Sequence, residues 1–362
     1  MKFRRAACFL TTALAAGGAL ADPPATIAAD VAALEAVLSS YNVYVDGNFG
    51  TSSNPYTSDS QGAMAIGGNA WLTGFQAGSA LPKGQTALTV GGTLTASNGS
   101  ASGSVVVGGT TSFPSANGGF TVNGNLTLAE AAKNASLPSK VTGATSFSQV
   151  SAGGAAASIA STFSQLTAAS QDLNSTLRTT GTAGTVSKNG NELDLTGTGS
   201  VNFFTVSASQ LVGINGLRFN TAKGSTTIVD VEGQFAPGGT LTNFGFLGNV
   251  DPTHTLFNFV DAKQISLNGI GFDGSILAPN AQITALNGQF DGTVIANSFG
   301  SVTYNDAEFH EDAFQGYIDP PGTATPVPEP TALALLLAGM GSILLVFGRR
   351  PKARLAQVPT RR

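Results

Sequence analysis

The sequence is poor in the residues that carry most enzyme chemistry. Of its 362 residues only one is cysteine and two are histidine, and charged residues make up 10%. The cysteine, Cys8, lies in an apolar stretch near the N-terminus, so the rest of the chain can form neither disulfides nor thiolate metal sites. The fold must therefore be held by apolar burial and backbone hydrogen bonds, and the chain is long enough for a sizeable core.

Catalytic and cofactor-binding motifs are also missing from the sequence. It contains no HExxH, GxSxG, P-loop or Cys/His cluster. His254 and His310 are interpreted as turn or coil-end residues. The Gly-Gly turns lack the lysine and the following helix of a phosphate-binding loop. We therefore expect no cofactor and no enzymatic activity.

The N-terminus carries an export signal. A basic start at residues 2–5 precedes a short apolar run that ends in an A-x-A pattern at Ala19 and Ala21. This order is typical of a secretory signal peptide, so residues 1–21 are predicted to be removed. A second membrane anchor is the alternative interpretation.

The C-terminal end has three consecutive parts. Val327, Pro328, Glu329 and Pro330 come first, an uncharged apolar run at 331–347 follows, and a basic cluster begins with Arg349 and Arg350. A helix over this run is about 26 Å long, close to the ~30 Å hydrocarbon core of a bilayer. Basic residues mark the cytoplasmic side. The pattern predicts a transmembrane helix with a basic cytoplasmic tail at 351–362; a buried core helix is the alternative.

The order of parts in residues 327–350 resembles a PEP-CTERM sorting signal. The resemblance implies that an exosortase recognises the Pro-Glu-Pro motif and removes the helix. Association with the inner membrane would then be transient, and the protein would pass to the cell surface or the extracellular matrix. The tail after Arg350 is longer than is usual in that family. Hydropathy alone predicts only an anchor.

Without its two ends the chain is strongly acidic. Residues 22–326 keep eight basic and twenty acidic residues, which gives a net charge of −12, against −4 for the whole chain. Such a surface disfavours nucleic acid, because binding there depends on Lys and Arg that neutralise phosphates. It suits solubility outside the cell.

Two helices are predicted in an otherwise strand-like chain. Apolar residues from Ile27 to Leu38 recur at spacings of 4, 3 and 4, which predicts an amphipathic helix within residues 22–40. A longer helix is predicted at about 147–178 from the stripe that runs from Ile159 to Leu177. Its single apolar stripe must lie against another element, and the side of the strands is the expected surface.

The remaining sequence repeats a strand, a glycine corner and a second strand. Four such units align on Ile66, Val90, Val107 and Val122, each followed by Gly-Gly or Asn-Gly. Strands in phase at a regular period are the signature of a solenoid.

A second repeat appears near the end of the chain. The segment "FDGSILAPN" begins at Phe272 and "FDGTVIANS" begins at Phe290, and these two segments are called the late repeats. A step of the same length back from Ser275 reaches "FNFV" at Phe257. On one of the two possible phases, stacked coils at this period have an inner row of four residues, Ile276, Ala278, Val294 and Ala296, and the sequence leaves the phase open. The same strands are apolar on both faces, which predicts that one outer face is covered.

The segments "YNVYVDGNFG", "SQGAMAIGGNA" and "LDLTGTGSVNFFTV" and the late repeats resemble a choice-of-anchor A domain over residues 41–318. The late repeats also resemble the closing coils of ice-binding adhesin domains. These resemblances imply a mainly β fold, a discontinuous parallel β-helix with one long α-helix packed alongside. Residues 319–326 would link it to the C-terminal signal.

The function expected from these features is that of an exported surface or matrix protein. It would be structural or adhesive, with exopolysaccharide of a biofilm or other surface proteins as partners. A polysaccharide-active enzyme and an ice-binding protein, with threonines on a flat coil face, remain alternatives.

The enzyme alternative depends on Asp273 and Asp291, which occupy the same position in successive coils. Stacking would place them about 5 Å apart, similar to the ~5–5.5 Å between the carboxyl groups of a retaining glycosidase. An Asp-Gly corner or a bound cation such as calcium are other interpretations of the pair.

Overall fold

The computed structural model describes part of the chain: residues 24–112, 119–129, 141–142, 146–150, 153–236, 239–242, 244–301, 303 and 305–318. Residues up to 318 belong to one compact unit. Several predicted features lie outside the described residues. They are the signal cleavage residues Ala19 and Ala21, the sorting motif at Val327–Pro330, and the basic residues Arg349 and Arg350. Within the described part, no helix has the length and apolar character that crossing a membrane requires.

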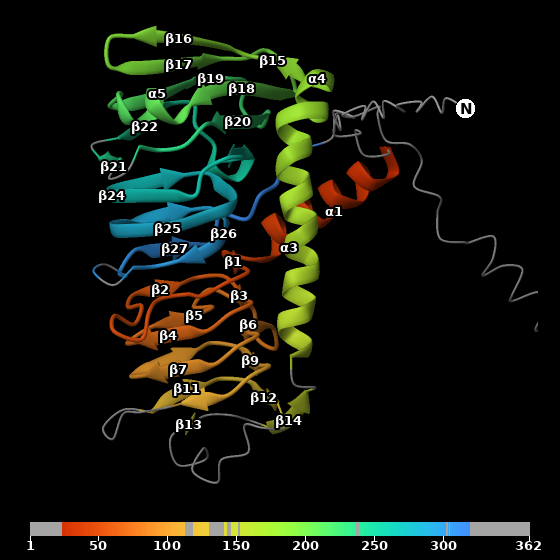
Figure 1. The fold of residues 1–362 in the computed structure, drawn as a ribbon, viewed down its shortest axis with the longest axis vertical. Helices are drawn as coiled ribbons and strands as arrows, with labels where there is room; N and C mark the ends of the chain where they lie inside the picture. Colours follow the sequence, from red (N-terminus) through yellow and green to blue (C-terminus); the bar gives the residue numbers. More distant parts are fainter. Residues whose placement is uncertain are drawn as a thin grey trace, which may run out of the picture. The chain divides into compact units, whose positions relative to one another are not determined.

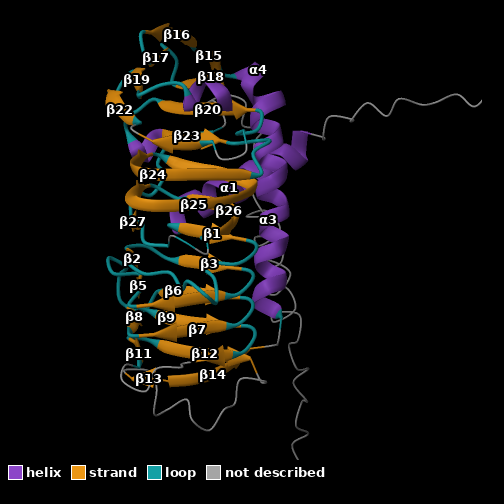
Figure 2. Ribbon diagram, turned by 60° about the vertical axis from the view of Figure 1, so that its left-hand side comes forward, coloured by secondary structure: helices purple, strands orange, loops and turns teal. Residues whose placement is uncertain are grey.

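The strands stack as a parallel β-solenoid with three faces (Figures 1 and 2). The coil at residues 86–101, for example, contributes one strand segment to each face, and the Gly-Gly corner at 91–92 joins its first two segments. Face A runs through β14 (Ser146–Val150), β12 (Asn125–Ala129), β9 (Ser104–Val107), β6 (Thr86–Val90), β3 (Met64–Ile66), β1 (Val43–Val45), β26 (Val294–Phe299), the start of β25 (Ser275–Asp291), β23 (Thr255–Asn258), β20 (Thr226–Glu232), β18 (Val201–Ser207) and β15 (Thr182–Ala183).

The other two faces use the same coils. Face B consists of β13 (Val141–Thr142), β11 (Phe120–Val122), β8 (Gly99–Ala101), β5 (Gln76–Ala77), β2 (Asp59–Ser60), β27 (Glu308–His310) and the last residues of β25 and of β24 (Gln264–Asp273). Face C consists of β10 (Thr111–Ser112), β7 (Leu94–Ser97), β4 (Ala70–Thr73), the middle of β25, the first part of β24 and β21 (Thr240–Thr242).

A four-stranded sheet and several helices complete the unit. The sheet has the order β16 (Thr185–Asn189), β17 (Glu192–Thr196), β19 (Gly216–Asn220) and β22 (Gly245–Gly248), and only its β16–β17 pair is antiparallel. The helical segments are α1 (Pro24–Ser40), α3 (Gly154–Asp172), the π-turn η2 (Leu173–Leu177), α4 (Arg178–Thr180), α5 (Ala208–Val212) and the 3-10 turn η3 (Pro252–His254).

The chain enters this stack in the middle, which makes the β-helix discontinuous. β1 pairs with β3 on one side and with β26, the next-to-last strand, on the other. From β1 the chain winds to β14 at one end, and α3 then runs alongside the coils to the opposite end (Figure 1). The later strands wind back until β27 pairs with β2. Two halves far apart in sequence therefore close one continuous sheet.

Three sequence expectations need correction. Residues 147–150 are part of β14 and pair with β12, so the long helix begins only at Gly154, after Gly153 with φ of 75°. Val122 lies on face B and pairs with Ala101; it is Leu128 that stacks on Val107. The expected alignment was wrong because this unit's glycine corner joins face B to face A.

The third correction concerns the period of the coils. Phe272 pairs with Phe290, as the late repeats require, but Phe257 pairs with Ile276 and not with Ser275. The coil that runs from Phe257 to Ile276 is therefore one residue longer than the coil that runs from Phe272 to Phe290.

Side chains on opposite sides of the face A strands from β3 to β18 enter two separate cores. Ile276, Ala278, Val294 and Ala296 are inside the coils, which settles the phase that the late repeats left open. The intervening Leu277 and Ile295 face outward and join a second cluster with the apolar stripes of α1 and α3. The helices therefore account for strands that are apolar on both faces.

Aromatic rings fill the interior where the two halves of the chain meet. Phe49 and Tyr56 come from the first half, and Phe299 and Phe309 come from the second. The ring centroids of Phe49 and Phe299 are 5.7 Å apart, and those of Tyr56 and Phe309 are 5.9 Å apart. Phe290 stacks on Phe309 at 5.3 Å. Because these residues are buried together, the two halves share one core.

Candidate functional site

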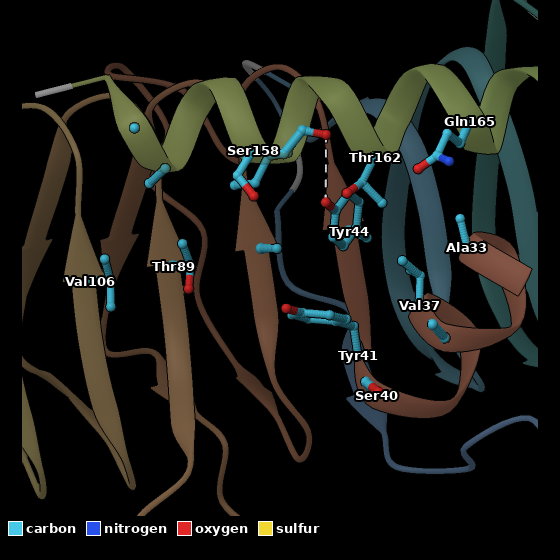
Figure 3. A pocket seen from close by; sticks show the side chains of 15 residues that line it. Ala33, Val37, Ser40, Tyr41, Tyr44, Thr89, Val106, Ser158, Thr162 and Gln165 are labelled. Atoms are coloured by element: carbon cyan, nitrogen blue, oxygen red, sulfur yellow. Dashed lines mark hydrogen bonds between the residues drawn. The ribbon is translucent and has the colours of Figure 1, made fainter. Parts of the chain in front are cut away.

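A groove lies between α1, α3 and face A (Figure 3). Its volume is about 700 Å³, within the ~300–1,000 Å³ that is usual for small-molecule sites. Face A forms the floor, one side of α3 forms a wall, and the C-terminal part of α1 closes one end. Nothing in the sequence indicated this groove, because its residues come from five separated stretches of the chain: 33–44, 65, 89, 106 and 154–165.

Side-chain size on face A explains why this space is left open. The outward residues at successive strands of the floor are Tyr44, Ala65, Thr89 and Val106. Tyr44 is large enough to reach α3, and its hydroxyl donates to the carbonyl oxygen of Ile159 at 3.5 Å. The residues that follow are too short to fill the same gap.

Corner glycines let α3 approach the edge of the coils beside the groove. A Cβ atom added at Gly91 would be only 2.7 Å from the Cβ atom of Ala156 on α3. An added Cβ atom at Gly108 would be 3.2 Å from that of Ala155. The absence of side chains at these glycines therefore allows α3 to pack close to the edge of face A.

The groove combines aromatic rings with neutral polar groups. The rings of Tyr41 and Tyr44 meet edge to face, with centroids 5.2 Å apart. Figure 3 shows both tyrosines between the strands of Thr89 and Val106 and the end of α1. Burial raises the pKa of the Tyr44 hydroxyl, so it stays protonated at neutral pH.

The remaining polar groups of the groove are hydroxyl and amide side chains. They are contributed by Ser40, Thr89, Ser158, Thr162 and Gln165, and none of the residues that line the groove is Asp, Glu, Lys, Arg or His. The site can therefore donate and accept hydrogen bonds without presenting a charge.

Ionisable groups gather instead on face B. Asp273 pairs with Asp291, and Asp291 pairs with His310, so the three side chains form one row across β24, β25 and β27. The Nδ1 atom of His310 is 2.7 Å from Oδ1 of Asp291, and its Nε2 atom is 3.4 Å from Glu308. This row includes both aspartates singled out from the late repeats.

Two groups in this row, Asp273 and His310, have raised pKa values. Burial, the charge of Asp291 and a hydrogen bond to it raise the pKa of Asp273 to about 6. Burial lowers the pKa of His310, but hydrogen bonds and attraction to Asp291 and Glu308 outweigh it and raise that pKa overall. The two aspartates occupy paired positions on adjacent strands, and a retaining glycosidase holds its two carboxyl groups about 5–5.5 Å apart around the substrate.

No set of three or more His, Cys, Asp or Glu side chains arranged for a metal ion occurs among the described residues. The other histidine, His254, is in the turn η3 beside Asp251. Its Nδ1 atom is 3.1 Å from the carboxylate of Asp251. This local contact agrees with its interpretation as a turn residue.

Face C has no charged side chain on its strands in the part of the chain that is described. Thr240 pairs with Ser266, which pairs with Thr284, and the Thr284 hydroxyl donates to Ser266 at 3.2 Å. Farther along this face, Trp71 pairs with Thr95. A shallow groove of about 400 Å³ follows the hydroxyl row of Thr240, Ser266 and Thr284.

A buried polar network ties α3 to face A. The Nδ2 atom of Asn258 donates to Asp230 at 2.8 Å and to the carbonyl oxygen of Ser170 at 2.8 Å. The Ser170 hydroxyl donates to Oδ1 of Asn258 at 2.6 Å. Burial, only partly opposed by Asn258 and Arg178, raises the pKa of Asp230 to about 6. Its Oδ2 atom has no hydrogen-bond partner among the described residues.

Comparison with known proteins identifies the family of this solenoid. The family model described as "Putative Ice-binding-like adhesive domain" matches residues 34–311, which include α1 from Leu34 onward and all the described strands. No curated protein and no solved structure matches the chain. The match covers well over half of the 362 residues. The chain therefore belongs to the family of ice-binding-like adhesive domains.

Proposed function

We propose that the protein is an exported surface or matrix component that adheres to exopolysaccharide, with other surface proteins as further partners. Membership of an adhesive family is the observation that carries this proposal. Within the described residues, α1 and α3 cover face A, while most of face B and face C has no helix over it. Repeated weak contacts along a rigid solenoid add up to a higher overall avidity.

Export and release follow from the two ends of the sequence. A signal peptide at residues 1–21 would direct the chain through the inner membrane, and the helix at 331–347 would hold it there for a time. An exosortase would then cut near Val327–Pro330. The motif resembles its substrates, and an adhesive domain is suited to the cell surface or the extracellular space.

Cell fractionation and intact-mass measurement test this route. The released protein should begin near Asp22 and lack the residues after the Pro-Glu-Pro motif. A Glu329→Ala variant should stay in the membrane fraction at its uncut mass, and Glu311→Ala, outside the motif, serves as the control. Wild-type protein that remains full length in the inner membrane would refute release.

The protein is proposed to act without catalysis, nucleic acid or a cofactor. The strongest acid–base candidates are Asp273 and Asp291, which occupy paired positions on adjacent strands. An Asp273→Asn, Asp291→Asn double variant should adhere to exopolysaccharide like the wild type. Release of reducing sugar by the wild type, abolished in the variant, would instead establish a polysaccharide-active enzyme.

Ice binding is the second candidate function, favoured by the hydroxyl row on face C. Thr240, Ser266 and Thr284 lie on three adjacent strands, about 4.8 Å apart from strand to strand. A regular uncharged row suits an ordered water lattice. Thermal hysteresis that is lost in Thr284→Lys would support this candidate, and its absence in the wild type would reject it.

A further inference from the structure

We infer that the groove between α1, α3 and face A is a binding site for a neutral oligosaccharide segment of a polysaccharide. This inference rests on the proposed adhesive function and assigns a ligand class and a location to it. The argument depends on the charge, the aromatic rings and the size of the groove.

Charge separates this groove from the rest of the surface. None of its lining residues is ionisable except for two tyrosines, and burial keeps Tyr44 in its neutral form. A cluster of charges lies on face B around Asp291, and the charge of Asp46, which is not among the lining residues, also raises the pKa of Tyr44. A uronic-acid polymer would meet an acidic protein and find no cation in the groove, whereas a neutral sugar loses no ionic hydration there.

The groove offers two kinds of contact that a pyranose ring requires. Tyr41 is half-buried and presents an aromatic ring at the end of α1, where the apolar C–H face of a sugar can pack. Thr89, Ser158 and Gln165 supply donors and acceptors for the sugar hydroxyls. A neutral site with one aromatic surface and several hydroxyl or amide groups fits a carbohydrate better than a lipid or a charged peptide.

The shape favours a chain over a single sugar. α1 closes the groove at Ser40 and Tyr41, but β6 and β9 continue beyond it under α3 (Figure 1). Their outward residues, Thr89 and Val106, line the floor. An oligosaccharide can therefore end against the tyrosines and extend along the coils.

Binding of soluble hexasaccharides to the purified exported protein tests the site. The probes are neutral glucose and mannose hexamers and an acidic hexauronate, measured by calorimetry. Ser158→Trp fills the groove from an exposed position on α3, and Ser164→Trp is the matched control on the same helix away from the groove. Tyr41→Ala removes the aromatic surface, while Tyr41→Phe keeps it.

We expect a neutral hexamer to bind and the hexauronate not to bind. Ser158→Trp should abolish binding, and Ser164→Trp should leave it unchanged. Tyr41→Ala should weaken binding about tenfold, the loss expected for one aromatic contact, whereas Tyr41→Phe should stay within about threefold of the wild type. Circular dichroism and melting of each variant establish that it is folded.

Two results would overturn the site while leaving the adhesive function intact. One is equal hexamer binding by the Ser158→Trp and Ser164→Trp proteins, which would place the glycan elsewhere. The other is a wild-type protein that is retained normally at the cell surface but binds no hexamer. That result would mean that another occupant, such as a terminal segment of the chain, fills the groove. Failure of surface retention itself would instead refute the proposed function.

Discussion

Replacing Asp230 with Asn should stabilise the protein at neutral pH. Asp230 is fully buried between α3 and face A, and its pKa is raised from an ordinary 3.8 to about 6. The unfolded chain therefore loses this proton at a lower pH than the folded chain does. The contribution of protonated Asp230 to the free energy of unfolding is fully present below about pH 4 and is lost as the pH rises through about 6.

The size of this effect follows from the two pKa values. At 1.36 kcal/mol per pKa unit, ionisation of Asp230 costs about 3 kcal/mol at pH 7. Asn at this position stays neutral and can still accept the hydrogen bond from Asn258 through its Oδ1 atom. Its new amide group has no partner at the position of Oδ2, which offsets about 1 kcal/mol of the gain.

Urea unfolding of wild type and variant between pH 4 and pH 8 gives the measurement. The difference in unfolding free energy should be near zero or slightly unfavourable to the variant at pH 4, and should grow in its favour to about 2 kcal/mol at pH 7. Taking the difference cancels other titrating groups. A difference that does not change with pH, or a variant that becomes less stable as the pH rises, would refute the assignment.

Three further changes probe the aromatic core shared by the two halves of the chain, a corner glycine beside α3, and the row of ionisable groups on face B. Phe309→Ala should lower the free energy of unfolding by about 3–5 kcal/mol in urea titrations, because a fully buried ring is lost. Gly91→Ala should cost about 1–3 kcal/mol, since its Cβ atom would meet both the backbone carbonyl oxygen of Gly67 in the neighbouring coil and Ala156 on α3, while Gly213→Ala, whose added atom has ordinary contacts only, should melt like the wild type. Asp291→Asn should lower the pKa of both Asp273 and His310 in NMR titrations; unchanged values would contradict the row on face B.

The sequence predicted the local elements of the fold and the late coils well. The late repeats placed Ile276 and Val294 at the same position of successive coils, and the two do stack there, but the inward face could not be chosen because these strands are apolar on both sides. The stripe from Ile27 to Leu38 likewise predicted a buried helix face, which α1 has. Such signals depend only on neighbours along the chain.

The path of the chain was harder to predict because it depends on contacts between distant residues. Val43 pairs with Val294, and nothing in either short strand specifies the other as its partner. Periodicity also failed where coils vary in length: Phe257 pairs with Ile276 instead of Ser275, and Ser146–Val150 is a strand that was assigned to the helix. The resemblance to ice-binding adhesin domains supplied the discontinuous topology that the spacing did not.

The candidate groove could not be predicted from the sequence. Tyr41 follows a helix, Thr89 is in a strand and Gln165 belongs to another helix, and each has an ordinary role in its own element. The space between them exists because Ala65 is small where Tyr44 is large, which matters only once the coils are stacked. The stacking of Asp273 on Asp291, by contrast, could be predicted because both lie in one regular repeat.

Hydrogen exchange measured by mass spectrometry, with and without a neutral hexasaccharide, tests glycan binding by this solenoid most directly. Slower exchange is expected in peptides that cover the end of α1, at residues 33–44, and the start of α3, at residues 154–165, with face B unchanged. Protection confined to the strands of face B or face C, or no protection at saturating sugar, would contradict the site.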